Sequence, residues 1–537
     1  MKKLSPLVLS LLSGLLLFAC WPVSPLSFLV FIAFVPLLVL ADQCKKRTAY
    51  FGCIYLALFI WNAATTWWTC KASLPGGISA VMANSLLMCI PLLGYYNVKK
   101  RMGHRAGYIA FIIFWMSFEW IHLNWELSWP WLTLGNVFAT HPGWVQWYEY
   151  TGTSGGTLWV LLVNLLFFLA IRNRQLAISN RQWTIGNRKI FVAIGLIILL
   201  PAVLSFFLGR AEEKTSIDDR QSAAYNIVVV QPNIDPWDEK FAAGKEEAQL
   251  RNLIRLSESQ MDAHTALVVW PETAVPVPIN EDSMHSSYFL AAVWDFSKKH
   301  PAVNLLTGIE GFRFFTEQTK TAYAQKLPHG HLYAEGYNSA ALLDSNRFQI
   351  YHKSKLVPGA EVLPSFLHFL DSWFEEFGGT TGGYVRQKER TVLRTYNNTY
   401  AIAPAICYES IYGEFMTAYI RAGANLIAVI TNDGWWGNTA GYKQHESYAR
   451  LRAVETRRWV IRSANTGISC FIDPLGKVFD AQPWDKASAV KMNVPMDNRM
   501  TFFVLHGDLL SKIAVGATIL LLVWNLVVIF KNKFNRG

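Results

Sequence analysis

Eight long apolar stretches run through the chain and constrain its fold more than any other feature. A helix of about 20 apolar residues matches the thickness of the hydrocarbon core of a bilayer. Charged residues make up only 16% of the 537 residues, whereas soluble proteins contain about a quarter. The sequence therefore predicts an α-helical transmembrane bundle of eight spans. The expected spans are residues 5–20, 24–41, 50–68, 78–97, 107–123, 155–171, 190–208 and 512–530.

The loops between these stretches alternate in charge. Basic clusters precede the first stretch, follow the second and the fourth, separate the sixth from the seventh, and end the chain. Cytoplasmic loops of membrane proteins carry the excess of Lys and Arg, so both termini are expected in the cytoplasm and residues 210–511 on the opposite face. The net charge of +11 could also suggest nucleic acid, but membrane topology explains the basic loops better. No nucleic-acid partner is expected.

The N-terminus allows a second interpretation. Lys2, Lys3, an apolar run and Leu17-Phe18-Ala19-Cys20 together resemble a lipoprotein signal peptide with a lipidated cysteine. Six further apolar stretches follow before any polar domain, so a retained first span is preferred. Under the alternative, the mature chain would begin at Cys20.

The character of the sequence changes after the seventh stretch. Short β-rich runs such as Leu267–Trp270 and Ala401–Ile406 alternate with helical stretches such as Glu246–Ala263 and Tyr442–Thr456. Strands interleaved with helices indicate an α/β domain with a covered sheet. We therefore expect a transmembrane domain of seven helices, a linker, a polar domain and a C-terminal transmembrane helix, at residues 1–209, 210–224, 225–500 and 511–531.

Cys407 has the most distinctive setting of the seven cysteines. No pair of cysteines has metal-site spacing, and five lie in or beside apolar stretches, where cysteine acts as a small hydrophobe. Cys407 follows the run Ala401–Ile406 and precedes Tyr408-Glu409-Ser410, which suggests a junction of strand, turn and helix. The N–H groups that open a helix would lower the pKa of a thiol there and would hold an oxyanion. For the residue taken alone, packing in the core is the commoner role.

Two charged residues upstream stand in similar positions. Glu272 follows Trp270-Pro271, where proline stops a strand and presents the carboxylate at its end. An apolar neighbourhood would raise its pKa, as a general base requires, and a role at a helix N-terminus is the alternative. Lys353 lies between His352 and Ser354, and taken alone it would be a solvated surface lysine. A base, a cation and a thiol at the ends of strands are the parts of a covalent acyl-transfer site.

The three motifs, in this order, resemble the carbon–nitrogen hydrolase, or nitrilase, superfamily. The resemblance implies a nitrilase-like α-β-β-α sandwich for the polar domain and a Glu–Lys–Cys triad. It makes Glu272 the general base, Lys353 the residue that stabilises the tetrahedral intermediate, and Cys407 the nucleophile. Lys353 is preferred over Lys355 because of its spacing from the Val-Pro pair that follows.

A domain of this superfamily between seven spans and an eighth resembles the apolipoprotein N-acyltransferase family. The resemblance implies that Glu361 and Glu409 are supporting acids and that Tyr408 lines the site. It also assigns Trp237 to the position of a family tryptophan, although the local spacing differs. The family commonly has Pro-Phe-Gly-Glu where this chain has Pro358-Gly359-Ala360-Glu361, and the difference bears on the shape of that loop. Further matching pieces are Gln231–Ile234, Tyr337-Asn338-Ser339, Asn432–Gly437 and Arg462–Gly467.

The resemblance implies a two-step acyl transfer in the bacterial inner membrane, as the last step of lipoprotein maturation. A phospholipid would donate a fatty acyl chain to Cys407 as a thioester, and the N-terminal amine of a diacylglyceryl-cysteine apolipoprotein would accept it. The protein would be multi-pass, with cytoplasmic termini and a periplasmic catalytic domain, and it would act as a monomer without cofactor or metal. Two alternatives stay open: a membrane-tethered amidase or nitrilase that hydrolyses a C–N bond, and a catalytically silent membrane scaffold.

Overall fold

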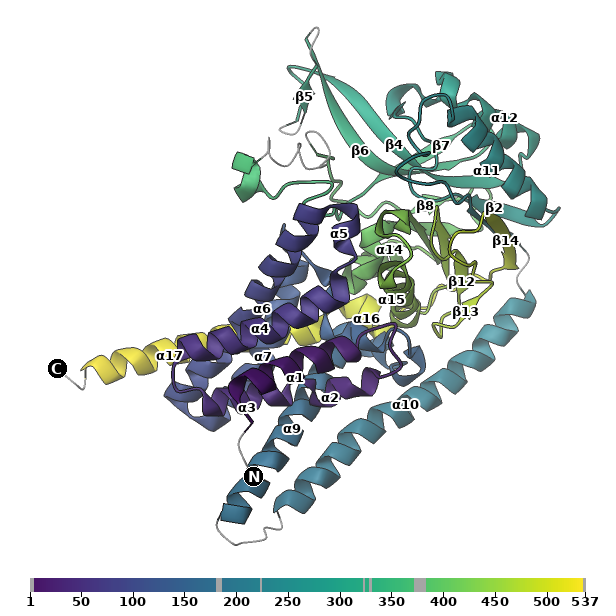
Figure 1. Ribbon diagram of the computed structural model, residues 1–537. Coiled ribbons are helices and arrows are strands. Elements are labelled where there is room, and N and C mark those ends of the chain that lie inside the picture. Colours follow the sequence, from purple (N-terminus) through teal and green to yellow (C-terminus); the bar gives the residue numbers. More distant parts are fainter. Residues whose placement is uncertain are drawn as a thin grey trace. The chain divides into compact units, whose positions relative to one another are not determined.

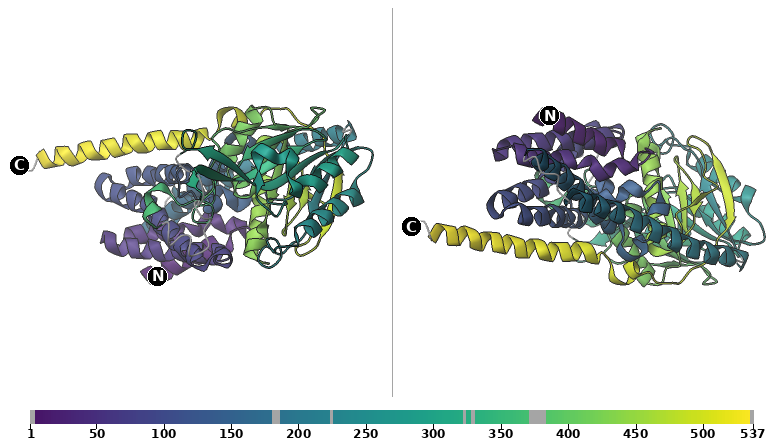
Figure 2. Two further views of the ribbon diagram at one scale, coloured as in Figure 1. Left: turned by 90° about the horizontal axis from the view of Figure 1, so that it is seen from above. Right: turned by 90° about the horizontal axis from the view of Figure 1, so that it is seen from below.

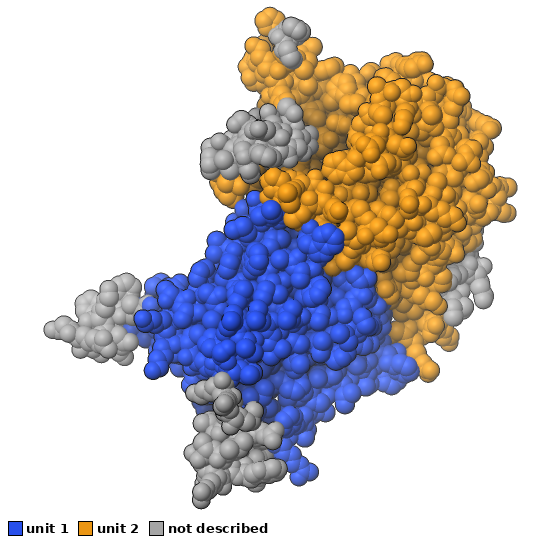
Figure 3. All heavy atoms as spheres, viewed as in Figure 1, with its two compact units in different colours: residues 1–67, 77–208, 506–537 blue, residues 68–76, 209–505 orange. Residues whose placement is uncertain are grey.

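The computed structural model describes residues 4–179, 186–222, 225–321, 324–327, 331–370 and 383–534. The chain forms two compact units, coloured blue and orange in Figure 3. The first contains residues 1–67, 77–208 and 506–537, and the second contains residues 68–76 and 209–505. The two units differ in the elements that build them.

The first unit consists of helices. Among the described residues, six helices of the chain are long and apolar enough to cross a membrane. The expected spans are thus supported in part, because two shorter apolar helical regions, Pro6–Ala19 and Ser27–Gln43, stand where the first two were expected. The six long helices are α4 (Arg47–Thr66), α6 (Leu74–Met102), α7 (His104–Leu123), α9 (Thr153–Ser179), α10 (Gly186–Ser222) and α17 (Leu509–Phe534). The shorter helices are α1 (Pro6–Ala19), α2 (Val30–Ala33), α3 (Val35–Gln43) and α8 (Tyr148–Thr151).

Helices α10 and α17, drawn in Figures 1 and 2, carry large apolar side chains that are exposed. Phe207 on α10 is 64% exposed, and Leu520 on α17 is 73% exposed. Apolar surface of this extent is unfavourable in water and favourable in lipid. Helix α10 also continues through residues 210–222, so the expected linker is helical as far as Ser222.

The second unit contains two β-sheets, and the β-rich runs that the sequence predicted are strands in them. The first sheet has the order β14-β1-β2-β4-β6-β5, with β3 beside β4 and β7 beside β6. Of these strands, the sequence did not predict β3, β5, β7 or β14. The strands are β1 (Asn226–Gln231), β2 (Thr265–Val269), β3 (Ile279–Asn280), β4 (Asn304–Thr316), β5 (Gln325–Lys326), β6 (Leu332–Leu343), β7 (Phe348–His352) and β14 (Ser488–Asn493).

The second sheet has the order β13-β12-β11-β10-β9-β8. Its central strands β9, β10 and β11 are parallel and fully buried, as expected for strands covered on both faces. The strands are β8 (Leu393–Arg394), β9 (Ala401–Ile406), β10 (Leu426–Thr431), β11 (Val460–Ala464), β12 (Cys470–Ile472) and β13 (Val478–Phe479).

Helices cover the outer faces of the two sheets. Leu253 of α11 (Glu246–Gln260) and Val293 of α12 (Ala291–Lys299) pack against Val268 of the first sheet. Helices α14 (Gly413–Arg421) and α15 (Ala440–Thr456) contact β9 and β11 of the second. The sheets meet where Ser463 Oγ donates to the carbonyl of Val230 at 2.8 Å. The layers are helices, sheet, sheet and helices, so the polar domain is an α/β domain with covered sheets, as the sequence predicted (Figure 1).

Several strands of the two sheets end close to the same place. Strand β2 is followed by Glu272, β9 by Cys407 and β10 by Asn432. Strands β1, β2 and β4 are parallel to one another, as are β9, β10 and β11. In parallel sheets, the polar residues after the carboxyl ends of strands gather at one edge, which is where such folds bind ligands.

Candidate active site

Cys407 stands where β9 ends and a short 3-10 helix, η8 (Cys407–Ile411), begins. Its φ of +51° lies in the left-handed region, which costs a non-glycine residue about 1 kcal/mol. Such a conformation persists only where the surrounding structure enforces it, and it is typical of functional positions. The predicted strand–turn–helix junction is present, with the 3-10 turn between the strand and helix α14.

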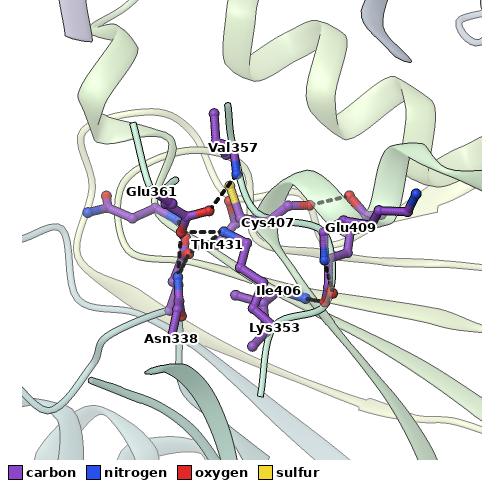
Figure 4. A network of polar contacts seen from close by, with 12 residues as sticks. Asn338, Lys353, Val357, Glu361, Ile406, Cys407, Glu409 and Thr431 are labelled. Atoms are coloured by element: carbon purple, nitrogen blue, oxygen red, sulfur yellow. Dashed lines mark hydrogen bonds and ion pairs between the residues drawn. The ribbon is translucent and has the colours of Figure 1, made fainter. Parts of the chain in front are cut away.

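Three charged side chains meet beside the thiol and form the lysine cluster: Glu272, Lys353 and Glu361. Figure 4 labels Lys353, Glu361 and Cys407. Lys353 Nζ lies 3.2 Å from Glu272 Oε1 and 2.8 Å from Glu361 Oε1. Lys353 is 1% exposed. Burial would lower the pKa of its ammonium, but the two carboxylates outweigh burial and hold that pKa well above its ordinary value. Lys353 is therefore a buried cation and not a surface lysine.

Backbone groups hold Glu272 in place. Its Oε2 accepts a hydrogen bond from the N–H of Asn432 at 3.1 Å, so the carboxylate of the first sheet is tied to the end of a strand in the second. Its carbonyl accepts from Lys240 Nζ at 3.0 Å. Burial lowers the pKa of Lys240 to about 8, and the charge of Glu272 opposes this shift.

Asn338 completes the lysine cluster. Its Nδ2 donates to Glu272 Oε1 and to Glu361 Oε1, each at 2.8 Å. Its carbonyl accepts from the N–H of Lys353 at 2.8 Å. Asn338 therefore sets the distance between the two carboxylates and the position of the lysine. The sequence had offered Tyr337-Asn338-Ser339 as a matching motif, without a role for the amide.

The thiol of Cys407 is buried among these charges. Burial raises its pKa, the charge of Glu272 raises it further, and that of Lys353 lowers it. The expectation that helix N–H groups lower this pKa is wrong for the net effect, because burial dominates. A raised pKa keeps the thiol neutral near pH 7, so attack requires a base that takes its proton.

Glu409 lies on the other side of Lys353 and anchors its loop. Its Oε1 accepts from Tyr351 Oη at 2.6 Å and from the N–H of Ser354 at 2.6 Å, and its Oε2 accepts from the N–H of Ile406 at 2.9 Å. Burial raises the pKa of this carboxyl, while the hydrogen bonds oppose the shift. Glu409 thus ties the loop of Lys353 to the strand that carries Cys407.

The other three residues that the sequence predicted for the site are Glu361, Tyr408 and Trp237, and each has a different environment. The carboxylate of Glu361 accepts from the N–H of Val357 at 2.8 Å, so it is held within its own loop. Tyr408 is buried, and its ring meets that of Tyr412 edge-on at 5.3 Å. Trp237 is 57% exposed and stands edge-on to Trp435 at 4.9 Å. Within the described residues, the structure gives Trp237 no contact with the lysine cluster.

A second buried group, the histidine cluster of Asp433, His445 and Arg462, contacts the backbone of Cys407. His445 Nε2 lies 3.1 Å from the carbonyl oxygen of Cys407, and His445 Nδ1 lies 2.9 Å from Asp433 Oδ1. Arg462 pairs with the other carboxylate oxygen of Asp433. All three side chains are fully buried. Burial raises the pKa of Asp433, but Arg462 and His445 outweigh this and lower it.

Ser410 joins the histidine cluster to the turn. Its Oγ donates to the carbonyl of Cys407 at 2.7 Å and lies 3.0 Å from His445 Nε2. A carbonyl oxygen only accepts hydrogen bonds, so Ser410 and His445 both donate to it. These contacts hold the left-handed backbone of Cys407. Sequence reasoning missed this role, because His445 lies within the predicted helix Tyr442–Thr456 with no motif of its own.

Two family models match the chain. The model of the carbon-nitrogen hydrolases matches residues 226–498, and the model of the apolipoprotein N-acyltransferase N-terminal domain matches residues 13–166. The first covers the two-sheet unit and the second covers most of the apolar helices. The matches therefore follow the division of the chain into a polar and an apolar part.

Relatives match over almost the whole length. The apolipoprotein N-acyltransferase of Chlorobaculum tepidum is 32% identical over 95% of this chain and 95% of its own length. That of Geobacter metallireducens is 26% identical over 95% of this chain and 93% of its own length. Among solved structures, Saccharomyces cerevisiae Nit3 of the nitrilase superfamily covers 53% of this chain and 94% of its own, with 16% identity and a TM-score of 0.36.

Proposed function

The chain belongs to the apolipoprotein N-acyltransferase family, and from this premise we propose that Cys407 carries a fatty acyl group from a phospholipid to the amine of an apolipoprotein. The observation that carries the proposal is the lysine cluster: a buried cation bonded to two carboxylates, next to a neutral thiol at the end of a strand. A thiol, a base and a cation in contact are what acyl transfer through a thioester requires.

In the first half-reaction, Glu272 takes the proton of Cys407 and the thiolate attacks an ester carbonyl of the phospholipid. Lys353 stabilises the negative charge on the tetrahedral oxygen. The C–O bond breaks, Glu272 gives its proton to the leaving oxygen, and a lysophospholipid departs. The acyl group remains on Cys407 as a thioester.

In the second half-reaction, the neutral α-amine of the diacylglyceryl-cysteine attacks the thioester carbonyl. The C–S bond breaks as the C–N bond forms. Glu272 takes a proton from the amine and returns it to the sulfur of Cys407. The products are the N-acylated lipoprotein and the free enzyme. Glu361 and Glu409 support the position of Lys353, while Tyr408 and Trp237 line the substrate path.

The membrane arrangement that we propose is eight spans in the bacterial inner membrane. Both termini are cytoplasmic and the two-sheet domain is periplasmic, as the basic loops favour. Each buried CH₂ of an acyl chain contributes about 0.8 kcal/mol, so donor and acceptor both stay in the bilayer. The enzyme therefore works where lipid substrates are held, and we propose that it does so as a monomer.

Intact-mass analysis after incubation with phospholipid tests this function. We expect one added acyl group, located on Cys407, and its loss with formation of N-acylated product when a diacylated lipopeptide is added. Cys407→Ser with the same lipid is the control for acylation elsewhere. Release of free fatty acid without transfer would instead identify a hydrolase, and an acyl group on another residue would contradict the role of Cys407.

A further inference from the structure

Glu310 is a carboxyl group beside the lysine cluster with no role in the steps above. Strands β4 and β6 pair antiparallel, and Glu310 stands directly opposite Asn338. Residues directly opposite each other in a sheet point their side chains to the same face, about 5 Å apart at Cβ. Ile309, the neighbour of Glu310, faces the helices of the first sheet. Because side chains alternate along a strand, Glu310 shares the inner face with Asn338.

Glu310 has no cation as a partner among the residues that the structure describes, although it is largely buried. Burial raises the pKa of its carboxyl, and a hydrogen bond with Tyr384 opposes the shift. Tyr384 is in turn close enough to Glu361 and Lys353 for their charges to affect its own pKa. The N–H of Tyr384 donates to the carbonyl of Glu361 at 2.9 Å. Glu310 and Tyr384 thus border the lysine cluster.

Asn338 supplies a buried acceptor without a hydrogen bond in the described chain. Its Nδ2 is used by the two carboxylates of the lysine cluster. Its Oδ1 is buried and has no hydrogen-bond partner in the described part of the chain. Turning the amide over would place that oxygen against two carboxylates, so its orientation is fixed. The amide oxygen therefore lacks a donor, while the carboxyl of Glu310 has a hydrogen bond with Tyr384 and no cation to balance its charge in the described chain, so both groups can accept from a cationic donor.

The same face becomes apolar farther along the hairpin. Phe312 stands opposite Gly336, where the ring of Tyr384 lies 3.5 Å from the position of a Cβ. Phe312 and Phe314 contact each other with ring centroids 5.1 Å apart. Phe314 and Leu332 are both more than two-fifths exposed, at 42% and 44%. A polar end beside the lysine cluster and an apolar strip beyond it suit an amphiphile with a cationic amine.

We propose that Glu310 and Asn338 Oδ1 form the subsite for the α-ammonium group of the acceptor lipopeptide, with Phe312 and Phe314 along its lipid. The subsite rests on the proposed function. An α-amine, with a pKa of about 7.7–8.0, is mostly protonated at neutral pH and donates several hydrogen bonds. Bound to Glu310, it stands near Glu272, since Asn338 donates to Glu272 and stands directly opposite Glu310. The ammonium releases one proton to water before the neutral amine attacks the thioester. The amine of a phospholipid headgroup has the same chemistry. It is, however, far along the lipid from the acyl ester that Cys407 attacks, so the acceptor amine fits this subsite better.

Glu310→Gln in the full-length enzyme tests the subsite. We expect the KM for a diacylated lipopeptide to rise about tenfold, since a charge-assisted hydrogen bond is lost. Acylation of Cys407 by phosphatidylglycerol, which has no amine, should proceed at the wild-type rate and so also report a folded enzyme. An α-N-acetylated lipopeptide, used as an inhibitor, should bind both enzymes equally.

The control is Glu317→Gln, because Glu317 lies on the same hairpin and pairs with Lys320 at 2.6 Å away from the lysine cluster. An unchanged KM for the lipopeptide in Glu310→Gln would overturn the subsite. So would a loss of acylation with phosphatidylethanolamine alone, which would assign Glu310 to the headgroup. Absence of acyl-Cys407 in the wild-type enzyme would instead contradict the proposed function itself.

Discussion

The lysine cluster and the histidine cluster lie on either side of Cys407 and contact different parts of it. Glu272 and Lys353 act on the thiol, where their charges shift its pKa in opposite directions. His445 contacts the carbonyl oxygen of the same residue at 3.1 Å. Both clusters are buried and paired, so neither is an ordinary surface network. The difference indicates that the largest charge effects on the Cys407 thiol and the position of its backbone come from separate groups.

Removal of the sulfur atom of Cys407 has the largest expected effect. Cys407→Ala should lower acyl transfer at least about a thousandfold, because the covalent route is lost. The measurement is N-acylation of a diacylated lipopeptide by the purified enzyme. Cys470→Ala is the matched control, since Cys470 is also buried in the same unit. Transfer by Cys407→Ala at a comparable rate would exclude a thioester on this residue.

Loss of the cation in the lysine cluster comes next. Lys353→Met should reduce kcat roughly 100- to 1000-fold, as expected when an oxyanion-stabilising group is removed. It also leaves Glu272 and Glu361 facing each other without the ammonium, so a thermal melt should accompany the kinetics.

Lys355→Met is the control that separates the two lysines of this loop. The ammonium of Lys355 lies 4.9 Å from the ring centroid of Tyr412 and has no ion pair with Glu272 or Glu361 in the described chain. We expect it to keep most of the activity. A larger loss for Lys355→Met than for Lys353→Met would reverse the assignment.

The histidine cluster should affect kcat but not substrate affinity. His445→Gln weakens the hold on the Cys407 carbonyl, and a misplacement of about 1 Å can cost roughly 100-fold in rate. We expect kcat to fall 10- to 100-fold on this basis, with little change in KM. His300→Gln removes a histidine of the same unit that lies 3.1 Å from a different carboxylate, Glu258, and it should change neither kcat nor KM. A rise in KM alone would argue for a role in binding.

The smallest effect is expected for Asp433→Asn. This variant separates the charge that the histidine cluster places near the Cys407 thiol from its role in positioning Cys407. Asp433 raises the pKa of the Cys407 thiol, after burial and Glu272. In Asp433→Asn that pKa should fall, so at any pH below it more thiolate forms and iodoacetamide alkylates Cys407 faster. Acyl transfer should nevertheless be slower, because His445 loses its partner. Alkylation rates from pH 7 to pH 10, corrected with Cys407→Ala, measure this. Alkylation that slows together with transfer would mean that the histidine cluster acts only through position.

Much of the fold followed from local pattern. The apolar stretches became helices, and runs such as Ala401–Ile406 and Leu426–Thr431 became buried parallel strands. Helix length alone does not give the number of spans, since helix α1, Pro6–Ala19, is only 14 residues long. Strands β7 and β14 escaped prediction because their half-exposed sequences, such as Phe348–His352, lack a continuous apolar run.

The sequence by itself determined which residues end strands, and so it offered Glu272, Lys353 and Cys407 as candidates. Only the tertiary structure decided that Lys353 is a buried cation, because strand order brings it to Glu272, 81 positions away in the chain. It also decided that His445 holds Cys407 and that Glu310 lies opposite Asn338. Local pattern specifies an element and its ends. The pairing of strands from distant segments specifies which charges share one desolvated space, and that sharing sets their pKa values and their chemistry.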